Sequence, residues 1–430
     1  MFDANEDGNL DLYVTSGGNS YSHGAMALLD RLYFGDGKGG FARSGQMLPS
    51  LSSLASTATV EVGDFNGDGH MDLFVGERLQ LFAVGLPARG FLLEGDGKGR
   101  FKNVTSQWAT DFSELGMITD AAWTDWDLDG REDLVVVGEW MGVQVYQNTG
   151  SQLKNISGAL GLSDTLSGWW NVVHPADLNK DGRMDLVLGN HGLNSRFEAS
   201  QDHPVKMWVG DFERNGQITQ ILSMPKDGKD YSVALRHELL EQMPSLEEKY
   251  PNYASYGGQT IQDIFSSNQL AQAQQLQASE LPSIIVWNKP DGVQVQRLPL
   301  RTQFSPIYGI WSGDLNGDNF PELLMGGNMH EVKPIAGQYN ASYGAALSTD
   351  DRVFTTWRSS DTGWFIPGAT RDIASVKMGN GNTLLVVARN NNSPMVFHII
   401  CTYLSIHFTV TPQVKHFLRK LKEKKDLKIS

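Results

Sequence analysis

The sequence predicts an all-β fold built from repeated units, on three observations. A nine-residue Asp-rich loop recurs five times with nearly the same spelling. Each copy is followed by a short run rich in Leu, Val, Phe and Tyr, which is typical of a β-strand. The first copies follow one another at intervals of about sixty residues, a period found in propellers and other repeat arrays. Together these observations predict a β-propeller, in which four-stranded sheets pack around an axis.

The loops carry the chemistry of a hard metal ion. They read DANEDGNLD from Asp3, DFNGDGHMD from Asp64, DWDLDGRED from Asp125, DLNKDGRMD from Asp177 and DLNGDNFPE from Asp314. Side-chain oxygens stand at positions 1, 3, 5 and 9, and position 6 is Gly or Asn, the residues that best tolerate a positive φ. Calcium takes roughly 6 to 8 oxygen ligands, and alternate residues of a tight loop can direct several oxygens to one centre. The sequence therefore predicts calcium as the cofactor.

The predicted ligands are the side chains at positions 1, 3, 5 and 9 and the backbone carbonyl at position 7. They are Asp3, Asn5, Asp7, Asn9 and Asp11; Asp64, Asn66, Asp68, His70 and Asp72; Asp125, Asp127, Asp129, Arg131 and Asp133; Asp177, Asn179, Asp181, Arg183 and Asp185; and Asp314, Asn316, Asp318, Phe320 and Glu322. A sixth copy, DFERNGQIT, keeps ligand types at Asp211, Glu213 and Asn215 but has Thr219 at position 9. We expect that site to be weak or empty.

An EF-hand opens with the same spacing but needs a Glu at position 12 and a helix on each side. Position 12 is apolar in every copy: Val14, Val75, Val136, Leu188 and Met325. The runs after the loops are β-rich, so each loop is predicted to join two strands rather than two helices.

Each unit is predicted to hold four strands. One strand precedes the loop, as at 57–62 and 118–123, and a second follows it. A third strand leads into a Gly-rich hairpin, seen in RLYFGDGKGGF from Arg31 and FLLEGDGKGRF from Phe91. Units that start near the N-terminus and near residues 57, 117, 169, 205, 307 and 369 predict seven blades. The first unit lacks its opening strand, so we expect the remainder of a longer parent protein upstream.

Two segments depart from the repeat, and together they set the predicted domain boundaries. Residues 232–280 show helical spacing of Leu residues and a capping box at Thr260 and Asp263, which predicts a helical insertion within the blade that starts near 205. This insertion is either a cover packed on one propeller face or a functional lid. The propeller is predicted to span residues 1–397, followed by an atypical basic tail at 398–430 that is either foreign or an amphipathic helix.

Composition narrows the classes of partner. The formal net charge is -14, and the predicted ligand positions hold sixteen carboxylates. Five divalent ions would leave a net charge of only -4, so much of the acidity belongs to the metal sites. An acidic chain argues against nucleic acid as a partner, because that partner needs a basic face. The single Cys401 excludes a disulfide framework, and no apolar run is long enough for a transmembrane segment.

These loops and several longer stretches carry a family resemblance. DRLYFGDGKGGF, GMITDAAWTDWDLDG, GWWN, VLGNHGLNSRFEAS and QFSPIYGI resemble FG-GAP, or VCBS, repeat propellers related to the integrin alpha head. More closely, they resemble the C-terminal half of bacterial surface proteins akin to cartilage acidic protein, associated with the ASPIC/UnbV domain. The resemblance implies a seven-bladed propeller that is secreted or displayed on the bacterial cell surface or outer membrane, and it implies no known reaction. No signal peptide is visible in this chain.

A candidate ligand face comes after the second strands, opposite the calcium turns. Its members are Glu77, Arg78, Glu139, Trp140, Asn190, His191 and Asn328. Polar and aromatic groups gathered at a propeller axis suit a binding site, although Asn and Gly in such places also simply form tight turns. Trp140 is the best single candidate, because an exposed indole would offer a stacking surface.

The sequence favours a calcium-stabilised binding or adhesion module with a protein or glycan ligand. No nucleophile elbow, HExxH motif or phosphate-binding loop is present. The alternatives are a propeller hydrolase or lyase with an active site on the axial face, or a purely structural unit of a larger surface protein.

Overall fold

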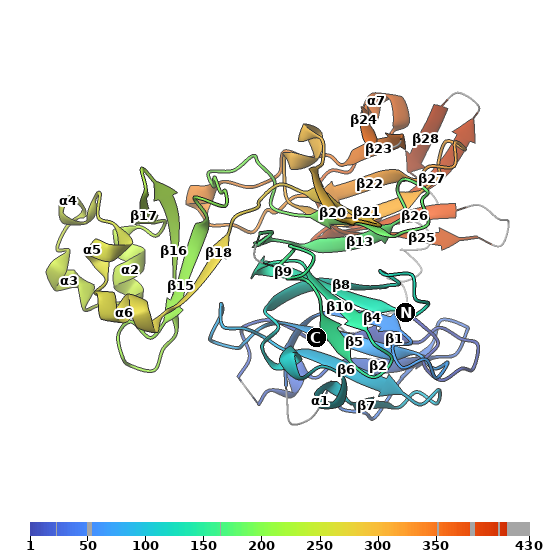
Figure 1. The fold of residues 1–430 in the computed structure, drawn as a ribbon, viewed down its shortest axis with the longest axis horizontal. Helices are drawn as coiled ribbons and strands as arrows, with labels where there is room; N and C mark the ends of the chain where they lie inside the picture. Colours follow the sequence, from blue (N-terminus) through green and yellow to red (C-terminus); the bar gives the residue numbers. More distant parts are fainter. Residues whose placement is uncertain are drawn as a thin grey trace. The chain divides into compact units, whose positions relative to one another are not determined.

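The computed structural model describes residues 1–22, 24–49, 54–163, 165–350, 352–378, 383–402 and 405–410. Their strands form seven sheets. By their internal contacts the residues divide into two compact units, the first made of 1–175, 195–281 and 286–295, the second of 176–194, 282–285 and 296–430. The fold is all-β with a few short helices (Figure 1).

Three sheets of the first unit have their strands side by side in chain order. The first contains β1 (Leu12–Val14), β2 (Arg31–Gly35) and β3 (Phe41–Arg43). The second contains β4 (Ser56–Gly63), β5 (Asp72–Leu79), β6 (Gly90–Gly95) and β7 (Phe101–Asn103). The third contains β8 (Met117–Thr124), β9 (Asp133–Met141), β10 (Gln144–Asn148) and β11 (Leu153–Asn155), with β12 (Gly168–Trp169) also on β9. The short helices α1 (Thr105–Trp108) and η2 (Thr110–Glu114) precede β8, and η1 (Met26–Leu28) precedes β2.

The chain of the fourth sheet contains an insertion that forms a separate sheet. Strands β13 (Val172–Ala176), β14 (Asp185–Gly189), β19 (Ile284–Lys289) and β20 (Gly292–Arg297) lie side by side in that order. Between β14 and β19 the chain builds β15 (Val205–Gly210), β16 (Thr219–Lys226), β17 (Lys229–Ser232) and β18 (Gln274–Ala278). The inserted sheet has the order β17-β16-β15-β18, so its last strand lies beside its first.

This topology corrects the predicted blade boundaries. The unit that starts near residue 205 was expected to be one of seven consecutive blades. It is instead a separate sheet inserted in the chain between β14 and β19, and its strand order differs from that of the other sheets. Seven blades are therefore not confirmed. The pattern was misleading because the partner of β14 is supplied from far along the chain, which no local repeat reveals.

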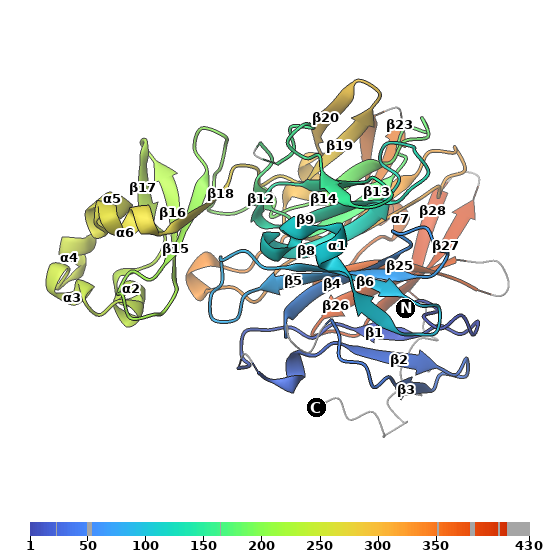
Figure 2. The same cartoon turned by 60° about the horizontal axis from the view of Figure 1, so that its bottom comes forward.

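Five short helices occupy the connection from β17 to β18. They are α2 (Arg236–Gln242), α3 (Leu246–Lys249), α4 (Tyr253–Tyr256), α5 (Ile261–Ile264) and α6 (Ser267–Gln272). The capping box at Thr260 and Asp263 is confirmed and begins α5. Helical residues such as Leu239 and Ile264 pack with Trp208 and Ile221 of the inserted sheet. The helices lie beside β15 to β17 in both views (Figures 1 and 2) and cover that sheet rather than another part of the first unit.

The second unit contains two further complete sheets. One has β21 (Ile307–Gly313), β22 (Glu322–Gly327), β23 (Ala345–Asp350) and β24 (Val353–Trp357), and the other β25 (Ala369–Lys377), β26 (Thr383–Asn390), β27 (Met395–Thr402) and β28 (Ser405–Val410). The short helices are η3 (Leu300–Gln303), η4 (Pro334–Ala336) and α7 (Ser359–Thr362). The predicted propeller boundary at residue 397 lies within β27, and β27 pairs in turn with β28. Residues 411–430 of the predicted tail lie outside the described residues.

The core lies between consecutive sheets. Leu73 and Val75 of β5 pack toward the first sheet, whereas Phe74 packs toward the third. Leu324 and Leu385 pack together in the same way within the second unit. A strand with both faces buried needs an unbroken apolar run, such as the one after each Asp-rich loop, and each such side chain contributes about 1.5–3 kcal/mol on burial. Within the described residues, no helix has the length and apolar character needed to span a membrane.

Candidate metal centre

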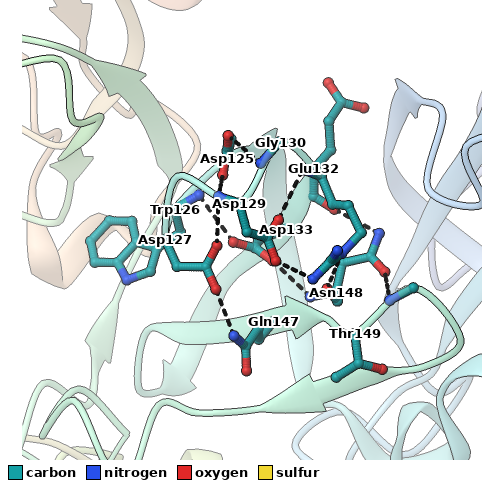
Figure 3. A network of polar contacts seen from close by, with 12 residues as sticks. Asp125, Trp126, Asp127, Asp129, Gly130, Glu132, Asp133, Gln147, Asn148 and Thr149 are labelled. Carbon is teal, nitrogen blue, oxygen red and sulfur yellow. Dashed lines mark hydrogen bonds and ion pairs between the residues drawn. The ribbon is translucent and has the colours of Figure 1, made fainter.

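The third Asp-rich loop brings three carboxylates together. It joins β8 to β9, and one oxygen from each of Asp125, Asp127 and Asp133 lies within 4.8 Å of the other two (Figure 3). Asp133 is buried, Asp125 is half-buried and Asp127 is exposed, so the group opens toward solvent on one side. An oxygen-only group of this spacing is suited to a hard divalent cation.

Backbone N–H groups hold this loop in shape. The Asp129 and Gly130 amides donate to the two Asp125 oxygens, each at 3.0 Å, and the Asp129 amide also donates to Asp127 at 3.2 Å. Leu128 and Gly130 have φ of 65° and 85°, which lets successive N–H groups turn inward. Hydrogen bonds to the loop's own carboxylates therefore help to set its conformation.

The same pattern repeats in the other loops. In each, the amide at position 6 donates to the carboxylate at position 1: Gly8 to Asp3 at 2.8 Å, Gly69 to Asp64 at 2.9 Å, Gly182 to Asp177 at 3.1 Å and Asn319 to Asp314 at 3.1 Å. Asn319 has a φ of 72°, so the Asn at position 6 adopts the conformation for which the other loops use Gly. The predicted loops thus share one backbone geometry across both units.

The carboxylate at position 9 has a structural role that the sequence did not reveal. The Asp133 carboxylate accepts from the backbone amide of Trp126 at 3.0 Å and from the backbone amide of Asn148 on β10 at 2.7 Å. Asp11 and Asp72 accept in the same way from Gly35 and Gly95, each at 2.8 Å. In these three loops position 9 therefore ties the loop to the strand that pairs with the one after it, namely β2, β6 or β10. The donors Gly35, Gly95 and Asn148 are the last residues of their strands. A metal-ligand motif does not include these residues, so the sequence pattern did not reveal the contact.

Burial raises the pKa of these closing carboxyls. The pKa of Asp133 is raised to about 6, and those of Asp72 and Glu322 to about 7, because burial disfavours the charged form. Backbone N–H donors oppose the shift and nearby loop carboxylates add to it. A bound cation at such a group would favour the ionised form instead.

Position 5 of the third loop contacts its neighbour Arg131, and its predicted role as a ligand stays a prediction. The Asp129 side chain accepts from the Arg131 amide at 2.9 Å and pairs with the Arg131 guanidinium. Asp127 instead accepts from the Gln147 side chain at 2.6 Å. The three gathered carboxylates are therefore those of positions 1, 3 and 9, and Asp129 is turned toward Arg131.

Four of the five loops carry Asn at position 3, which changes their donor set. In these loops the Asn carbonyl accepts from the amide at position 5, as in Asp68 to Asn66 at 2.8 Å and Asp318 to Asn316 at 2.7 Å. The Asn66 and Asn316 side-chain amides donate to the neighbouring Asp at position 5 at 3.1 and 2.8 Å. An amide oxygen replaces a carboxylate there, so the third loop has the most carboxylates at the predicted ligand positions.

The sixth copy keeps the backbone pattern but loses side-chain ligands. The Gly216 amide donates to Asp211 at 2.8 Å, as in the other loops. Glu213 accepts from the Ser245 hydroxyl next to α3, and Thr219 is buried at the start of β16. Asn215 accepts from the Gln217 amide at 2.9 Å.

Several members of the predicted ligand face make contacts within the protein, and their role in ligand binding stays a prediction. In the first unit, buried Glu77 accepts from Arg89 at 2.9 Å and Arg78 pairs with Glu139 at 2.7 Å. Trp140 was expected to expose its indole. It is half-buried, packs edge-on against Trp169 at 5.0 Å, and joins Met207 and Val209 in a hydrophobic cluster. Its exposure was overestimated because the inserted sheet that covers it was not foreseen.

The remaining members of that face belong to the second unit. Asn190 is fully buried, and its backbone amide donates to the Ser283 hydroxyl at 3.0 Å. Asn328 is buried, has a φ of 85°, and donates to the Ser342 carbonyl at 2.7 Å. Burial lowers the pKa of His191 to about 4, and its ring lies edge-on to Tyr339 at 4.7 Å.

Comparison with known families agrees with the loop geometry. A family model described as FG-GAP-like repeat matches residues 3–75 and 125–188. The chain contains FG-GAP-like repeats. The matched segments include the loops from Asp3, Asp64, Asp125 and Asp177, and together with the sheets they make this all-β chain a β-propeller. The finer resemblance to bacterial surface proteins akin to cartilage acidic protein remains a prediction.

Solved structures similar to this FG-GAP-like chain are distant. The periplasmic gluconolactonase PpgL of Pseudomonas aeruginosa is 12% identical, with 93% of this chain and 94% of that chain covered and a TM-score of 0.38. The biofilm matrix protein Bap1 of V. cholerae is 12% identical, with 84% and 72% covered and a TM-score of 0.31. The exotype rhamnogalacturonan lyase YesX is 11% identical, with 86% and 62% covered and a TM-score of 0.32. No curated protein matches the sequence.

Proposed function

We propose that this chain is a calcium-stabilised propeller that serves as a binding or adhesion module. One observation carries the calcium part of the proposal: the oxygens of Asp125, Asp127 and Asp133 converge within 4.8 Å in a loop whose backbone N–H groups donate to Asp125. Three carboxylates at this spacing repel one another unless a proton or a cation neutralises them. Calcium would supply that positive charge.

The donor set favours calcium over other divalent ions. The group contains neither His nor Cys, the ligands that zinc prefers. Magnesium usually keeps several waters and uses one or two carboxylates, whereas calcium accepts many protein oxygens in flexible geometry. Asp125, Asp127 and Asp133 would hold the ion together with the Arg131 carbonyl, and the ion would join the start, middle and end of the β8–β9 turn.

The proposed role of the ion is structural support of a module that works outside the cell. A site with a dissociation constant of roughly 10⁻⁴ M adds about 1.4 kcal/mol at millimolar calcium, a concentration regime typical of extracellular sites. Several such loops would supply a substantial part of the free energy of unfolding. We propose that the module is exported as part of a longer surface or secreted protein and binds a protein or a glycan. Its net charge of -14 disfavours nucleic acid.

Calcium titration of the full chain by isothermal calorimetry tests the proposal. The replacement Asp125→Asn removes a charge at position 1 but retains a side-chain oxygen, and we expect it to lower the calcium stoichiometry by one. Asp291→Asn, an exposed Asp in the β19–β20 turn, is the charge-matched control and should leave the stoichiometry unchanged. An unaltered stoichiometry in Asp125→Asn would exclude the third loop as a calcium site.

A further inference from the structure

An open groove in the second unit gathers exposed aromatic side chains. It has a volume of about 570 Å³ and is bounded by η3, the segment before β23 and the segment before β25. Tyr343 is 52% exposed, Phe365 48% and Phe304 40%, and Leu300 at the rim is 67% exposed. Four large apolar side chains in one groove leave more apolar surface in water than folding alone requires.

Each exposed ring is held outward by its neighbours in the chain. Phe304 lies between Gln303 and Ser305, Tyr343 between Ser342 and Gly344, and Phe365 between Trp364 and Ile366, and all six flanking residues are buried. Turning a ring inward would therefore bring buried neighbours, polar ones among them, into water. Exposure of the rings is a fixed property of the backbone, not a rotamer choice.

The three segments are also joined to one another. The Ala341 amide donates to the Ser305 hydroxyl at 3.0 Å, and the Ile366 amide donates to the Tyr343 carbonyl at 2.8 Å. Gly344 has a φ of 88°, and a Cβ there would lie 3.0 Å from the Trp364 indole nitrogen. These contacts connect the walls of the groove to one another, and such preorganisation lowers the ordering cost of binding a ligand.

Two of the rings stack on one another, and the groove also contains one cation. Tyr343 and Phe365 stack with centroids 4.7 Å apart and planes 11° from parallel. Arg301 is the one charged residue of the lining. It is half-buried, and among the described residues it has no hydrogen-bond or ion-pair partner. A guanidinium in this setting is available to a carboxylate, which it can bind through two parallel hydrogen bonds.

We propose that this groove binds a peptide segment of a partner protein in which an apolar side chain lies next to a carboxylate. The apolar side chain covers the Tyr343–Phe365 surface and Leu300, and the carboxylate pairs with Arg301. The assignment rests on the proposed binding role and names its partner class and its site.

A peptide suits the lining better than a glycan. Sugar rings stack on aromatic faces but need many polar partners for their hydroxyl groups. The polar side chains of the lining are four: Arg301, Ser342, Ser359 and the hydroxyl of Tyr343. Ser342 is buried, and its hydroxyl already accepts from the Gly344 amide at 3.1 Å. Leu300 offers aliphatic surface, which an apolar side chain covers and a pyranose ring does not stack upon.

The test uses the full, calcium-loaded chain and a phage-displayed library of random peptides. Binders are selected on the wild type after depletion on the double variant Tyr343→Ser/Phe365→Ser. Selected peptides are synthesised, and their dissociation constants are measured by fluorescence anisotropy. We expect enrichment of apolar residues beside Asp or Glu, with binding at least about tenfold weaker in the double variant. Arg301→Gln should weaken binding severalfold and reduce its salt dependence.

Control variants separate the possible outcomes. Phe41→Ser removes an equally exposed ring in the first unit and should leave peptide affinity unchanged. Melting curves and calcium stoichiometry of the double variant should match the wild type, so failure here is distinguishable from failure of the calcium proposal. If the double variant is unstable, Phe365→Ser alone replaces it. Failure to enrich peptides that discriminate the variants, or enrichment of basic peptides, would overturn the assignment. Glycan-array binding lost in the same variants, without peptide binding, would also overturn it.

Discussion

At the scale of single residues, the same side chain often serves two purposes. Asp133 belongs to the group of three carboxylates, and it also fastens the Trp126 and Asn148 amides. Its replacement therefore removes more than a ligand. A ligand motif in the sequence can select such a residue, but it does not show how much stability is lost when the residue is replaced. Its backbone partners lie on another strand and are not part of the motif.

His191 predicts a pH dependence of stability. Its folded pKa of about 4 lies below the ordinary value of 6.5, because burial disfavours the imidazolium. Above pH 6.5 both states are neutral. Below it the unfolded chain takes up a proton that the folded chain does not, so the free energy of unfolding falls between pH 6.5 and 4. We expect His191→Gln to remove about 1–2 kcal/mol of this loss at pH 5.

Chemical denaturation of wild type and His191→Gln at pH 7.5 and pH 5 measures this difference. Comparing the two proteins at each pH cancels other titrating groups, such as Asp30, whose pKa burial raises to about 6 and whose contribution has the opposite sign. A difference in unfolding free energy that stays constant between the two pH values would contradict the account.

Trp140 is predicted to stabilise the fold. Its ring contacts Trp169 and the Met207–Val209 cluster of the inserted sheet. We expect Trp140→Ala to lower the unfolding free energy by about 3 kcal/mol, since a large ring is removed from a packed site. Thermal melting checks this, with Tyr253→Ala, an exposed aromatic on α4, as the control. An unchanged melting temperature would make Trp140 a ligand-binding candidate again.

At the scale of elements, the Asp-rich turns share one backbone conformation but differ in the side-chain oxygens that they offer to a metal ion. The inserted sheet keeps the turn at Asp211 without its closing carboxylate, because Thr219 stands at the start of β16. The shared backbone and the missing ligand can be separated experimentally. This makes the sixth loop a useful place to test which feature would confer the proposed calcium binding.

Thr219→Asp is expected to raise the calcium stoichiometry by one. The new carboxylate would occupy the position of Asp133 in the third loop and accept from the backbone at the loop entry. Ser245→Ala is a useful second change, because it frees Glu213 from its hydrogen bond. Calorimetric titration gives the count. If neither the single nor the double variant gains an ion, the side-chain set alone does not define a site.

At the scale of the whole molecule, the sequence predicts local geometry better than long-range pairing. The loops, the strands that flank them and the capping box before α5 follow from residue types at short spacing, and the structure contains them. The pairing of β14 with β19 does not follow from residue types at short spacing, and neither does the extension of the last sheet to Val410. Both depend on partners that only the folded chain brings together. The aromatic groove was missed for the same reason, since its three segments are distant in sequence.

The central claim is that calcium stabilises this propeller, and the melting temperature of the full chain tests it most directly. Each loop holds carboxylates whose mutual repulsion a bound ion would relieve, so removal of calcium should destabilise the folded state. We expect the melting temperature to fall by several degrees in excess EGTA and to return when calcium, but not magnesium, is restored. A melting temperature that is the same in calcium and in EGTA would contradict the account.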